Sequence, residues 1–158
     1  MPLSTSNVLD RDENASICTL PMLLFGRRRV VSGIIRTIRC FEDNALIKST
    51  LATDSPGEIL VVDGGGSVDT ALLGDQIAAS ALAHGWAAVI LFGAVRDSTA
   101  LGTLDFHVKT LDLIPRKSAK RGKGEINVSI HCGGVDFVPG HYLYSDPDGV
   151  VVLSYCIA

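Results

Sequence analysis

The sequence predicts a mixed α/β fold in which strands and helices alternate over the first two thirds of the chain and a β meander forms the last third. Two short, continuous apolar runs, Glu58–Val62 and Ala87–Phe92, flank a helical pattern, as parallel strands covered on both faces do. In the last third, turn residues recur every few positions between short β-branched segments. A chain of 158 residues can bury one core without disulfide bonds, so we expect a single domain over residues 1–158.

The first fifty residues predict two short helices and one strand. Residues 1–16 are polar and are expected to be poorly ordered or to form a short helix within residues 5–12. The β-branched stretch Val30–Cys40 predicts a strand, because apolar residues partly alternate along it. A helix is expected over Asn44–Leu51, with Asp43 as its N-cap.

The rest of the chain predicts one longer helix and a series of strands. Gly74–His84 places its apolar residues on one stripe at helical spacing, and Gly85 is a natural C-terminal stop. The strand at Ala87–Phe92 is expected to turn at Gly93-Ala94-Val95, before a short helical turn at Ser98–Leu104. The remaining strands are expected at Phe106–Leu111, Ile126–His131, Val135–Val138, His141–Ser145 and Val150–Tyr155.

Composition argues against nucleic-acid, secreted and membrane classes. The net charge of −3 gives no general reason to bind nucleic acid, and we expect the basic run Arg116–Lys123 to be a solvated loop without direct nucleic-acid contact. Four widely spaced cysteines do not resemble a disulfide scaffold. Met1–Glu13 contains no secretory signal, and Trp86–Gly93 is too short to span a bilayer, so we expect a cytoplasmic protein without a membrane contact.

The stretch from Gly74 to Asp97 contains the strongest candidate site, because α/β proteins hold ligands at helix starts and strand ends. Asp75 is either a ligand-contacting group at the helix start or a first-turn capping residue. Arg96 is either a bidentate clamp for the carboxylate of a keto acid or the partner of a structural carboxylate. Asp97 is either an oxygen ligand for Mg²⁺ or the N-cap of the next helix.

Other patterns do not match common sites. The glycine loop Asp63–Ser67 lacks the spacings of dinucleotide and P-loop motifs, so we expect it only to let the backbone line a pocket. The four histidines show no zinc-ligand spacing, and no serine lies in a nucleophile elbow. Lys109 is a weak candidate for a Schiff base, because nothing near it in the sequence marks a lowered pKa.

Motifs spread over most of the chain resemble those of the RraA-like family, which contains regulators of ribonuclease E activity and 4-hydroxy-4-methyl-2-oxoglutarate aldolases. The spacing of Asp75 from Arg96-Asp97, with twenty residues between them, is similar to the specific signature of this family. The matching segments are residues 38–44 (IRCFEDN), 63–67 (DGGGS), 74–75 (GD), 93–97 (GAVRD), 115–118 (PRKS), 133–135 (GGV) and 148–150 (DGV).

The resemblance implies a ββα swivelling-type domain in a ring-shaped homotrimer, or a dimer of trimers, with sites in clefts between subunits. In the aldolase members the aspartate matching Asp97 binds a divalent metal, for which we expect Mg²⁺ with Mn²⁺ as the alternative. The arginine matching Arg96 holds the pyruvate carboxylate, with backbone amides of the segment matching Gly74–Ile77. The substrate-binding residues expected from this match are Gly74, Asp75, Gln76, Ile77 and Arg96.

Two functions therefore follow from the resemblance. The first is metal-dependent retro-aldol cleavage of 4-hydroxy-4-methyl-2-oxoglutarate to two pyruvates, with oxaloacetate decarboxylation as a side activity. The catalytic residues are then Asp75, which lies near metal-bound water and relays a proton, the carboxylate clamp Arg96 and the metal ligand Asp97. The second is a non-catalytic regulator that binds and inhibits a ribonuclease E-type enzyme. Asp97 favours the enzyme, because some regulators lack this second aspartate.

Two departures from the family pattern bear on rate and substrate preference. Pro139-Gly140 is followed by His141 where family members commonly have aspartate, and we expect this to affect turn packing or an interface. The sequence also ends at Ala158, without the C-terminal extension that supplies a carboxylate to a neighbouring subunit in some bacterial aldolases.

Overall fold

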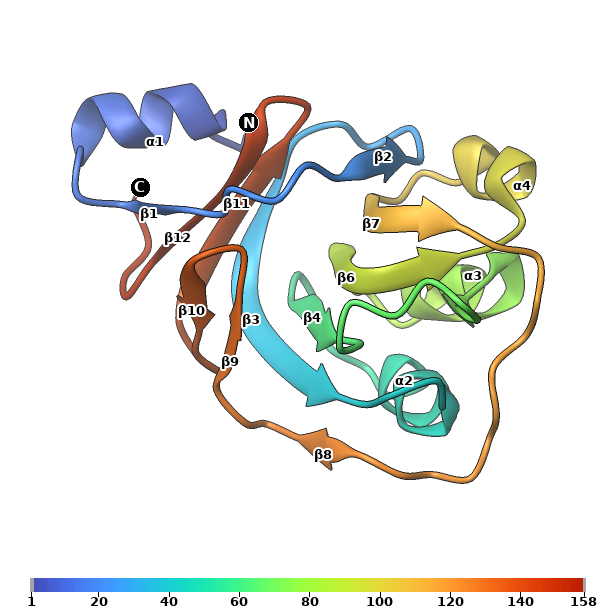
Figure 1. The fold of residues 1–158 in the computed structure, drawn as a ribbon. Coiled ribbons are helices and arrows are strands. Elements are labelled where there is room, and N and C mark those ends of the chain that lie inside the picture. Colours follow the sequence, from blue (N-terminus) through green and yellow to red (C-terminus); the bar gives the residue numbers. More distant parts are fainter. Residues whose placement is uncertain (1, 158) are drawn as a thin grey trace.

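A computed structural model describes residues 2–157, and its centre is a set of four parallel strands (Figure 1). The order across this part of the sheet is β3 (Val31–Arg39), β4 (Ile59–Asp63), β6 (Ala88–Val95) and β7 (Val108–Leu113). Every residue of β6 is buried, as is all of β4 except Asp63, because both faces of these central strands are covered.

The long strand β3 joins this parallel sheet to an antiparallel one. Its first residues pair with β11 (Tyr142–Asp146), and its last residues pair with β4. Beyond β11 lie β12 (Gly149–Leu153) and the short edge strand β1 (Ser16–Ile17). Figure 1 shows β3 curving strongly along its length, so the two parts of the sheet curl toward one another.

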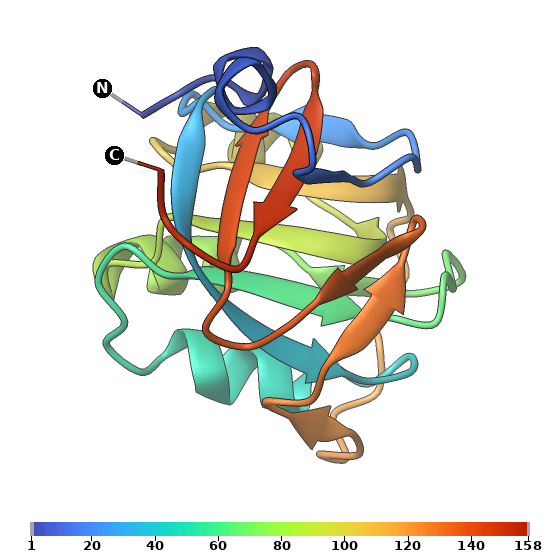
Figure 2. The same ribbon diagram turned by 90° about the vertical axis from the view of Figure 1, so that its left-hand side faces the viewer.

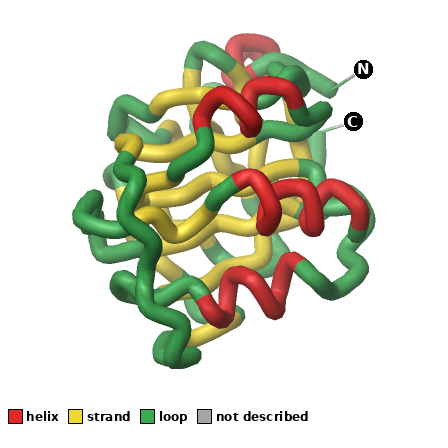
Figure 3. The backbone as a smooth tube through the Cα atoms, turned by 90° about the vertical axis from the view of Figure 1, so that its right-hand side faces the viewer, coloured by secondary structure: helices red, strands yellow, loops and turns green. Residues whose placement is uncertain are grey.

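Three helices cover the outer face of the parallel strands: α2 (Ala45–Leu51), α3 (Asp75–Ala83) and α4 (Ser98–Thr103) (Figure 3). Because successive side chains of a strand point to opposite faces, Leu60 and Val62 of β4 pack toward these helices while Ile59 and Val61 pack away from them.

The inner face is closed by the antiparallel strands and by a hairpin of β9 (Ile130–Cys132) and β10 (Val135–Phe137) (Figure 2). Phe137 of this hairpin is fully buried and its ring centroid lies 5.5 Å from that of Phe92 in β6. A separate helix, α1 (Thr5–Arg11), packs through Val8 against the outer side of β11 and β12.

The predicted mixed α/β class is confirmed, with a curled mixed sheet, few helices and antiparallel strands at the C-terminal end. The short N-terminal helix is also observed; Met1 and Ala158 lie outside the described residues.

Some element boundaries were wrong. The segment Gly93-Ala94-Val95 is not a turn but the end of β6. The single strand expected over Ile126–His131 is broken, because Asn127 has a left-handed backbone with φ of 56° between β8 (Glu125–Ile126) and β9. Three short strands had no sequence signal: β1, β2 (Leu23–Phe25) and β5 (Ala71–Leu73).

Candidate active site

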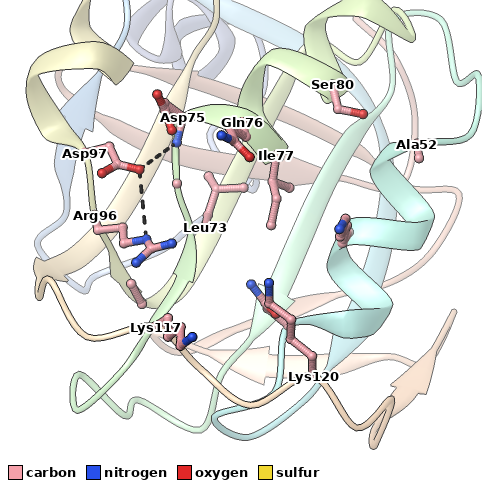
Figure 4. Close-up of a pocket in the computed structure, with 14 residues that line it drawn as sticks. Ala52, Leu73, Asp75, Gln76, Ile77, Ser80, Arg96, Asp97, Lys117 and Lys120 are labelled. Carbon is pink, nitrogen blue, oxygen red and sulfur yellow. Dashed lines mark hydrogen bonds and ion pairs between the residues drawn. The ribbon is translucent and has the colours of Figure 1, made fainter.

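A cavity of about 610 Å³ opens between α2, the start of α3 and the end of β6 (Figure 4). This is the carboxyl edge of the parallel strands, where open α/β sheets bind ligands. All five residues predicted from the sequence line it: Gly74, Asp75, Gln76, Ile77 and Arg96, and so does Asp97. The structure therefore brings the predicted site residues together from two segments.

Strand β5 holds these two segments side by side. It pairs in parallel with the last residues of β6, and the Arg96 backbone N–H donates a 3.0 Å hydrogen bond to the carbonyl of Leu73. Gly74 follows directly as the N-cap of α3. The start of α3 and the end of β6 are thus fixed against each other by backbone pairing.

Gly74 is required by a close approach rather than by a turn. Its φ of −134° is ordinary extended backbone. A Cβ atom at this position, however, would lie 2.6 Å from Oδ2 of Asp97 and 3.4 Å from Cγ of Arg96. The missing side chain at Gly74 is what lets the Asp97 carboxylate reach the first turn of α3.

The Asp97 carboxylate faces the cavity and does not cap its own helix. It occupies the N-cap position of α4, but its side chain makes no capping hydrogen bond there. Instead, Oδ2 accepts a 3.2 Å hydrogen bond from the backbone N–H of Asp75. The backbone of Asp97 is left-handed, with φ of 62° and ψ of 42°. Such a conformation is uncommon outside glycine and clusters at functional sites.

Arg96 lies beside this carboxylate, with its Nε 3.9 Å from Oδ2 of Asp97. The two side chains are 43% and 39% exposed, so the contact is a loose ion pair open to solvent. The guanidinium therefore keeps donors free for a second anion.

The first turn of α3 presents backbone donors to the same space. The first amides of a helix have no intrahelical acceptor, and their partial positive charge attracts anions. Asp75, Gln76 and Ile77 provide these amides, of which that of Asp75 already binds Asp97. The amides and the guanidinium together have the donor geometry that a small carboxylate requires.

Sequence reasoning missed eight further residues of the lining, and four of them carry amino or amide groups that a ligand can meet. Three are lysines with exposed side chains, Lys48 of α2 and Lys117 and Lys120 of the basic run, and the fourth is Asn44. An Asn-x-x-x-Lys spacing does place both residues of α2 on one helix face, but nothing in the sequence indicated which face meets the site. The position of Lys117 and Lys120 depends on long-range pairing.

The basic run is largely exposed, as expected of a solvated loop, but backbone hydrogen bonds hold it in place on both sides of the cavity. The Ala71 backbone N–H donates to the carbonyl of Arg116, and Ala119 exchanges backbone hydrogen bonds with Glu42 and Asn44. The Asp43 carboxylate accepts hydrogen bonds from the backbone N–H groups of residues 45, 121, 122 and 123.

The expectation that Asp43 is the N-cap of α2 was wrong, because the N-cap is Asn44; the Asp43 carboxylate instead accepts from the Ala45 N–H one residue further on. Burial by itself would raise its pKa, but the four backbone donors hold the pKa of this carboxyl below its ordinary value, so it stays ionised. The same side chain binds the first turn of α2 and the loop that contains Lys120.

A metal ion fits this site only as a partly hydrated ion. Among residues 2–157, no three His, Cys, Asp or Glu side chains are arranged to hold one. Asp97 offers a carboxylate whose Oδ1 accepts no hydrogen bond within the described part of the chain, and Asp75 stands beside it. Mg²⁺ suits such a site, because it binds through one or two carboxylates and keeps several waters.

Two other candidates from the sequence lie away from the cavity. Burial lowers the pKa of Lys109 to about 8, which the sequence did not foreshadow, but its ammonium already donates to the carbonyls of Asp146 and Gly149. The glycine loop 63–67 does not line the main cavity; Gly65 instead borders a separate hollow beside Phe41.

Comparison with known proteins gives a consistent family. A family model described as RraA-like, Aldolase/RraA, matches residues 5–152. A solved structure described as an S-adenosylmethionine:2-dimethylmenaquinone methyltransferase from Geobacillus kaustophilus HTA426 is 42% identical, with a TM-score of 0.96 over 98% of this chain and 97% of that one.

The RNA-processing inhibitor RraA from Thermus thermophilis is 39% identical, with a TM-score of 0.96 over 100% of this chain and 96% of that one. Streptomyces coelicolor RraAS2, described as an unusual member of the RNase ES inhibitor RraA family, is 26% identical, with a TM-score of 0.77 over 96% and 80% of the two chains.

Proposed function

The chain belongs to the RraA-like family, and on that premise we propose that it is a cytoplasmic, divalent-metal-dependent aldolase. It cleaves 4-hydroxy-4-methyl-2-oxoglutarate to two pyruvates and decarboxylates oxaloacetate as a side activity. The observation that supports this most directly is the Asp97 carboxylate, which approaches the first turn of α3 over Gly74 instead of capping α4.

Arg96 and the first turn of α3 bind and orient the keto acid substrate. The guanidinium and the amides of Gln76 and Ile77 hold the carboxylate next to the keto group, which fixes the keto acid in one orientation. Asp97 holds Mg²⁺ or Mn²⁺, and the bound ion supplies electrostatic stabilisation of the negative charge that develops on the keto oxygen.

Asp75 moves the protons. In the aldol cleavage it accepts the proton of the C4 hydroxyl while the C3–C4 bond breaks, which releases one pyruvate and leaves the enolate of the other. Return of the proton to C3 completes the second pyruvate. In oxaloacetate the same bond breaks with loss of CO₂, and C3 is again protonated. The Asp75 carboxylate is available for this role, because within residues 2–157 its side chain makes no hydrogen bond or ion pair, and the bond to Asp97 comes from its backbone N–H.

The charge of the cavity favours a small keto acid over a nucleoside-containing ligand such as a methyl donor. Within residues 2–157 the lining contains four cationic side chains, two carboxylates and no aromatic ring. Pockets for larger organic ligands are lined mainly by apolar and aromatic side chains. The name of the Geobacillus relative therefore gives no activity to this chain, since one fold supports several functions.

The test is pyruvate formation from oxaloacetate with Mg²⁺, with and without a chelator. We expect chelator-sensitive turnover that falls at least about a hundredfold in Asp97→Asn. Asparagine is the suitable replacement, because it tolerates the left-handed backbone of residue 97 better than alanine does. Asp105→Asn, which removes an exposed carboxylate paired with Arg28, is the matched control. Undiminished turnover in Asp97→Asn would refute the metal assignment.

We propose a homotrimer, or a dimer of trimers, with the cavity at a cleft between subunits. Light scattering of the purified protein checks this, and a stable monomer contradicts it.

A second function is favoured by one observation: the Thermus relative, described as an RNA-processing inhibitor, matches this chain along its full length. In this alternative the chain binds a ribonuclease E-type enzyme through its surface and inhibits it. Co-purification measures it, and we expect a complex at micromolar concentration that Asp97→Asn leaves intact. Absence of any complex at that concentration excludes this role.

A further inference from the structure

The cavity contains more positive charge than its own carboxylates neutralise. Four cationic side chains line it, Arg96 and the three lysines at positions 48, 117 and 120, against only Asp75 and Asp97. The whole chain, in contrast, has a net charge of −3. A local cationic surplus in an acidic protein concentrates anions at that place.

The three lysines form what we call the basic wall, defined as Lys48, Lys117 and Lys120. Within residues 2–157, none of their ammonium groups lies within ion-pair distance of a carboxylate. Figure 4 shows Lys117 and Lys120 along the rim opposite Asp75 and Asp97. Lys117 and Lys120 therefore lie on the other side of Arg96 from the two carboxylates of the cavity.

The basic wall is built into the fold rather than carried on a free loop. Lys117 forms an isolated parallel β-bridge with Ala71 of β5, and Ala119 forms a second one with Asp43. Three further hydrogen bonds, from the backbone N–H groups of residues 121 to 123 to the Asp43 carboxylate, fix the loop just after Lys120. Lys48 comes from α2, and the same carboxylate accepts from the N–H of Ala45 in the first turn of that helix.

Asn44 gives a second, independent sign of a ligand on this side. It is only 7% exposed, and its Oδ1 has no hydrogen-bond partner among the described residues. A buried, unpaired acceptor is costly and is normally satisfied by a hydrogen-bond donor, such as a ligand hydroxyl or an ordered water, so Asn44 points to a ligand here but does not itself bind the anion. Asn44 lines the same cavity as the basic wall.

We propose that the basic wall is a distal anion subsite, which selects substrates with a second carboxylate at the end away from the keto group. This inference rests on the proposed function, because it takes the first carboxylate to be held by Arg96 and α3. A cavity of about 610 Å³ has room for a five-carbon dicarboxylate. Lys48, Lys117 and Lys120 determine specificity here and take no part in proton transfer.

The experiment compares two acids of equal length that differ only at the distal end. 2-Oxoglutarate carries the second carboxylate, and 2-oxopentanoate has a methyl group in its place; neither has the C4 hydroxyl that aldol cleavage needs. Affinities are measured with Mg²⁺ by ligand-observed NMR titration, on the wild type and on Lys48→Gln, Lys117→Gln, Lys120→Gln and the triple variant.

We expect each single substitution to lower the affinity for 2-oxoglutarate about threefold and the triple variant to lower it about thirtyfold. These factors correspond to the loss of exposed ion pairs whose contributions add. The affinity for 2-oxopentanoate should stay unchanged. Lys123→Gln is the matched control, because it removes a lysine of the same loop that lines a different hollow. Thermal unfolding of every variant confirms that it is folded.

The outcomes separate the two proposals. Equal affinity of the wild type for both acids, or an equal effect of Lys123→Gln, overturns the distal subsite and leaves the proposed function standing. Failure of the wild type to bind either acid removes the proposed function, and the distal subsite with it. Both proposals are supported if only the basic-wall variants lose affinity, and if they lose it for 2-oxoglutarate but not for 2-oxopentanoate.

Discussion

Two clusters of charged residues lie at different places on the curled sheet, and they are built in opposite ways. At the carboxyl edge of the parallel half, Arg96 and Asp97 are partly exposed and meet in a single loose contact. Between β7 and the β11–β12 hairpin, Lys109, His107 and Asp146 are almost completely buried. Their hydrogen bonds decide what each cluster does.

The buried cluster satisfies its polar groups internally. Lys109 donates to two carbonyls, and His107 bonds the carbonyl of Arg28 and the hydroxyl of Ser145. Asp146 accepts from the backbone and hydroxyl of Thr5, which anchors the start of α1. Both ring nitrogens of His107 and both carboxylate oxygens of Asp146 have protein partners, so this cluster holds α1, β7 and the β11–β12 hairpin together. The cavity, in contrast, keeps its charges available.

The largest effect expected is on stability, from Asp146→Ala. Burial by itself would raise the pKa of Asp146, but its hydrogen bonds from Thr5, Asp148 and Gly149 hold the pKa below its ordinary value. Their loss beside the Lys109 cation should lower the free energy of unfolding by about 3 kcal/mol. Urea unfolding measures it, with exposed Asp148→Ala as the control. If the folded Asp146→Ala protein lost activity as well, the buried cluster would not be purely structural, and the contrast between the two clusters would be wrong.

The next effect is on activity, from Arg96→Lys. The substitution keeps the charge but removes the planar fork that grips a carboxylate, and we expect kcat/KM for oxaloacetate to fall about a hundredfold. Because the Arg96 side chain is 43% exposed, stability should change by less than about 0.5 kcal/mol. Steady-state kinetics of the purified variant measure the loss of kcat/KM, and urea unfolding of the same sample measures the change in stability. A stability loss as large as that of Asp146→Ala would mean that Arg96 is structural.

The third effect is a pH dependence that arises in the buried cluster. Burial lowers the pKa of His107 from 6.5 to about 4, so the unfolded chain takes up the proton first as pH falls. The stability contribution is complete above pH 6.5 and is lost between pH 6.5 and 4. Between pH 7 and pH 5 the free energy of unfolding should fall by about 2 kcal/mol.

Urea unfolding at the two pH values measures this slope. Asp43, Glu58 and Asp146 have pKa values below their ordinary range, so their contributions are lost only at lower pH. His107→Gln should therefore flatten the profile between pH 7 and 5. An equal slope in this variant would assign the effect to another group.

The smallest effect comes from Asp43→Asn, which links the cavity to the fold. An amide accepts fewer hydrogen bonds than a carboxylate, so we expect about 1 kcal/mol less stability. Hydrogen exchange should accelerate at the amides of residues 121 to 123 more than in the core strands. Affinity for 2-oxoglutarate should fall as the basic wall loosens. Unchanged exchange at these amides would show that other contacts hold the loop.

Much of the candidate site could be predicted from the sequence, because its residues stand at ends of strongly patterned elements. Gly74 and Asp75 begin the longest helix within residues 2–157, and Arg96-Asp97 follows a strand that is buried along its whole length. Local periodicity located both ends, and the family signature joined them. The sequence could not decide whether Asp97 is a metal ligand or a helix N-cap, since an aspartate before Ser-Thr is also a good N-cap.

The sequence by itself determined the alternation of strand and helix, the buried character of β4 and β6, and the helix start and the strand end at which the candidate site lies. These depend on side-chain periods of two and 3.6 residues, which are local. Only the tertiary structure decided that β5 joins Gly74 to Arg96, that Asp97 turns away from its own helix, and that Lys117 and Lys120 meet Lys48. Such contacts join residues far apart in the chain, and their free energy comes from pairing and close approach that no single segment encodes.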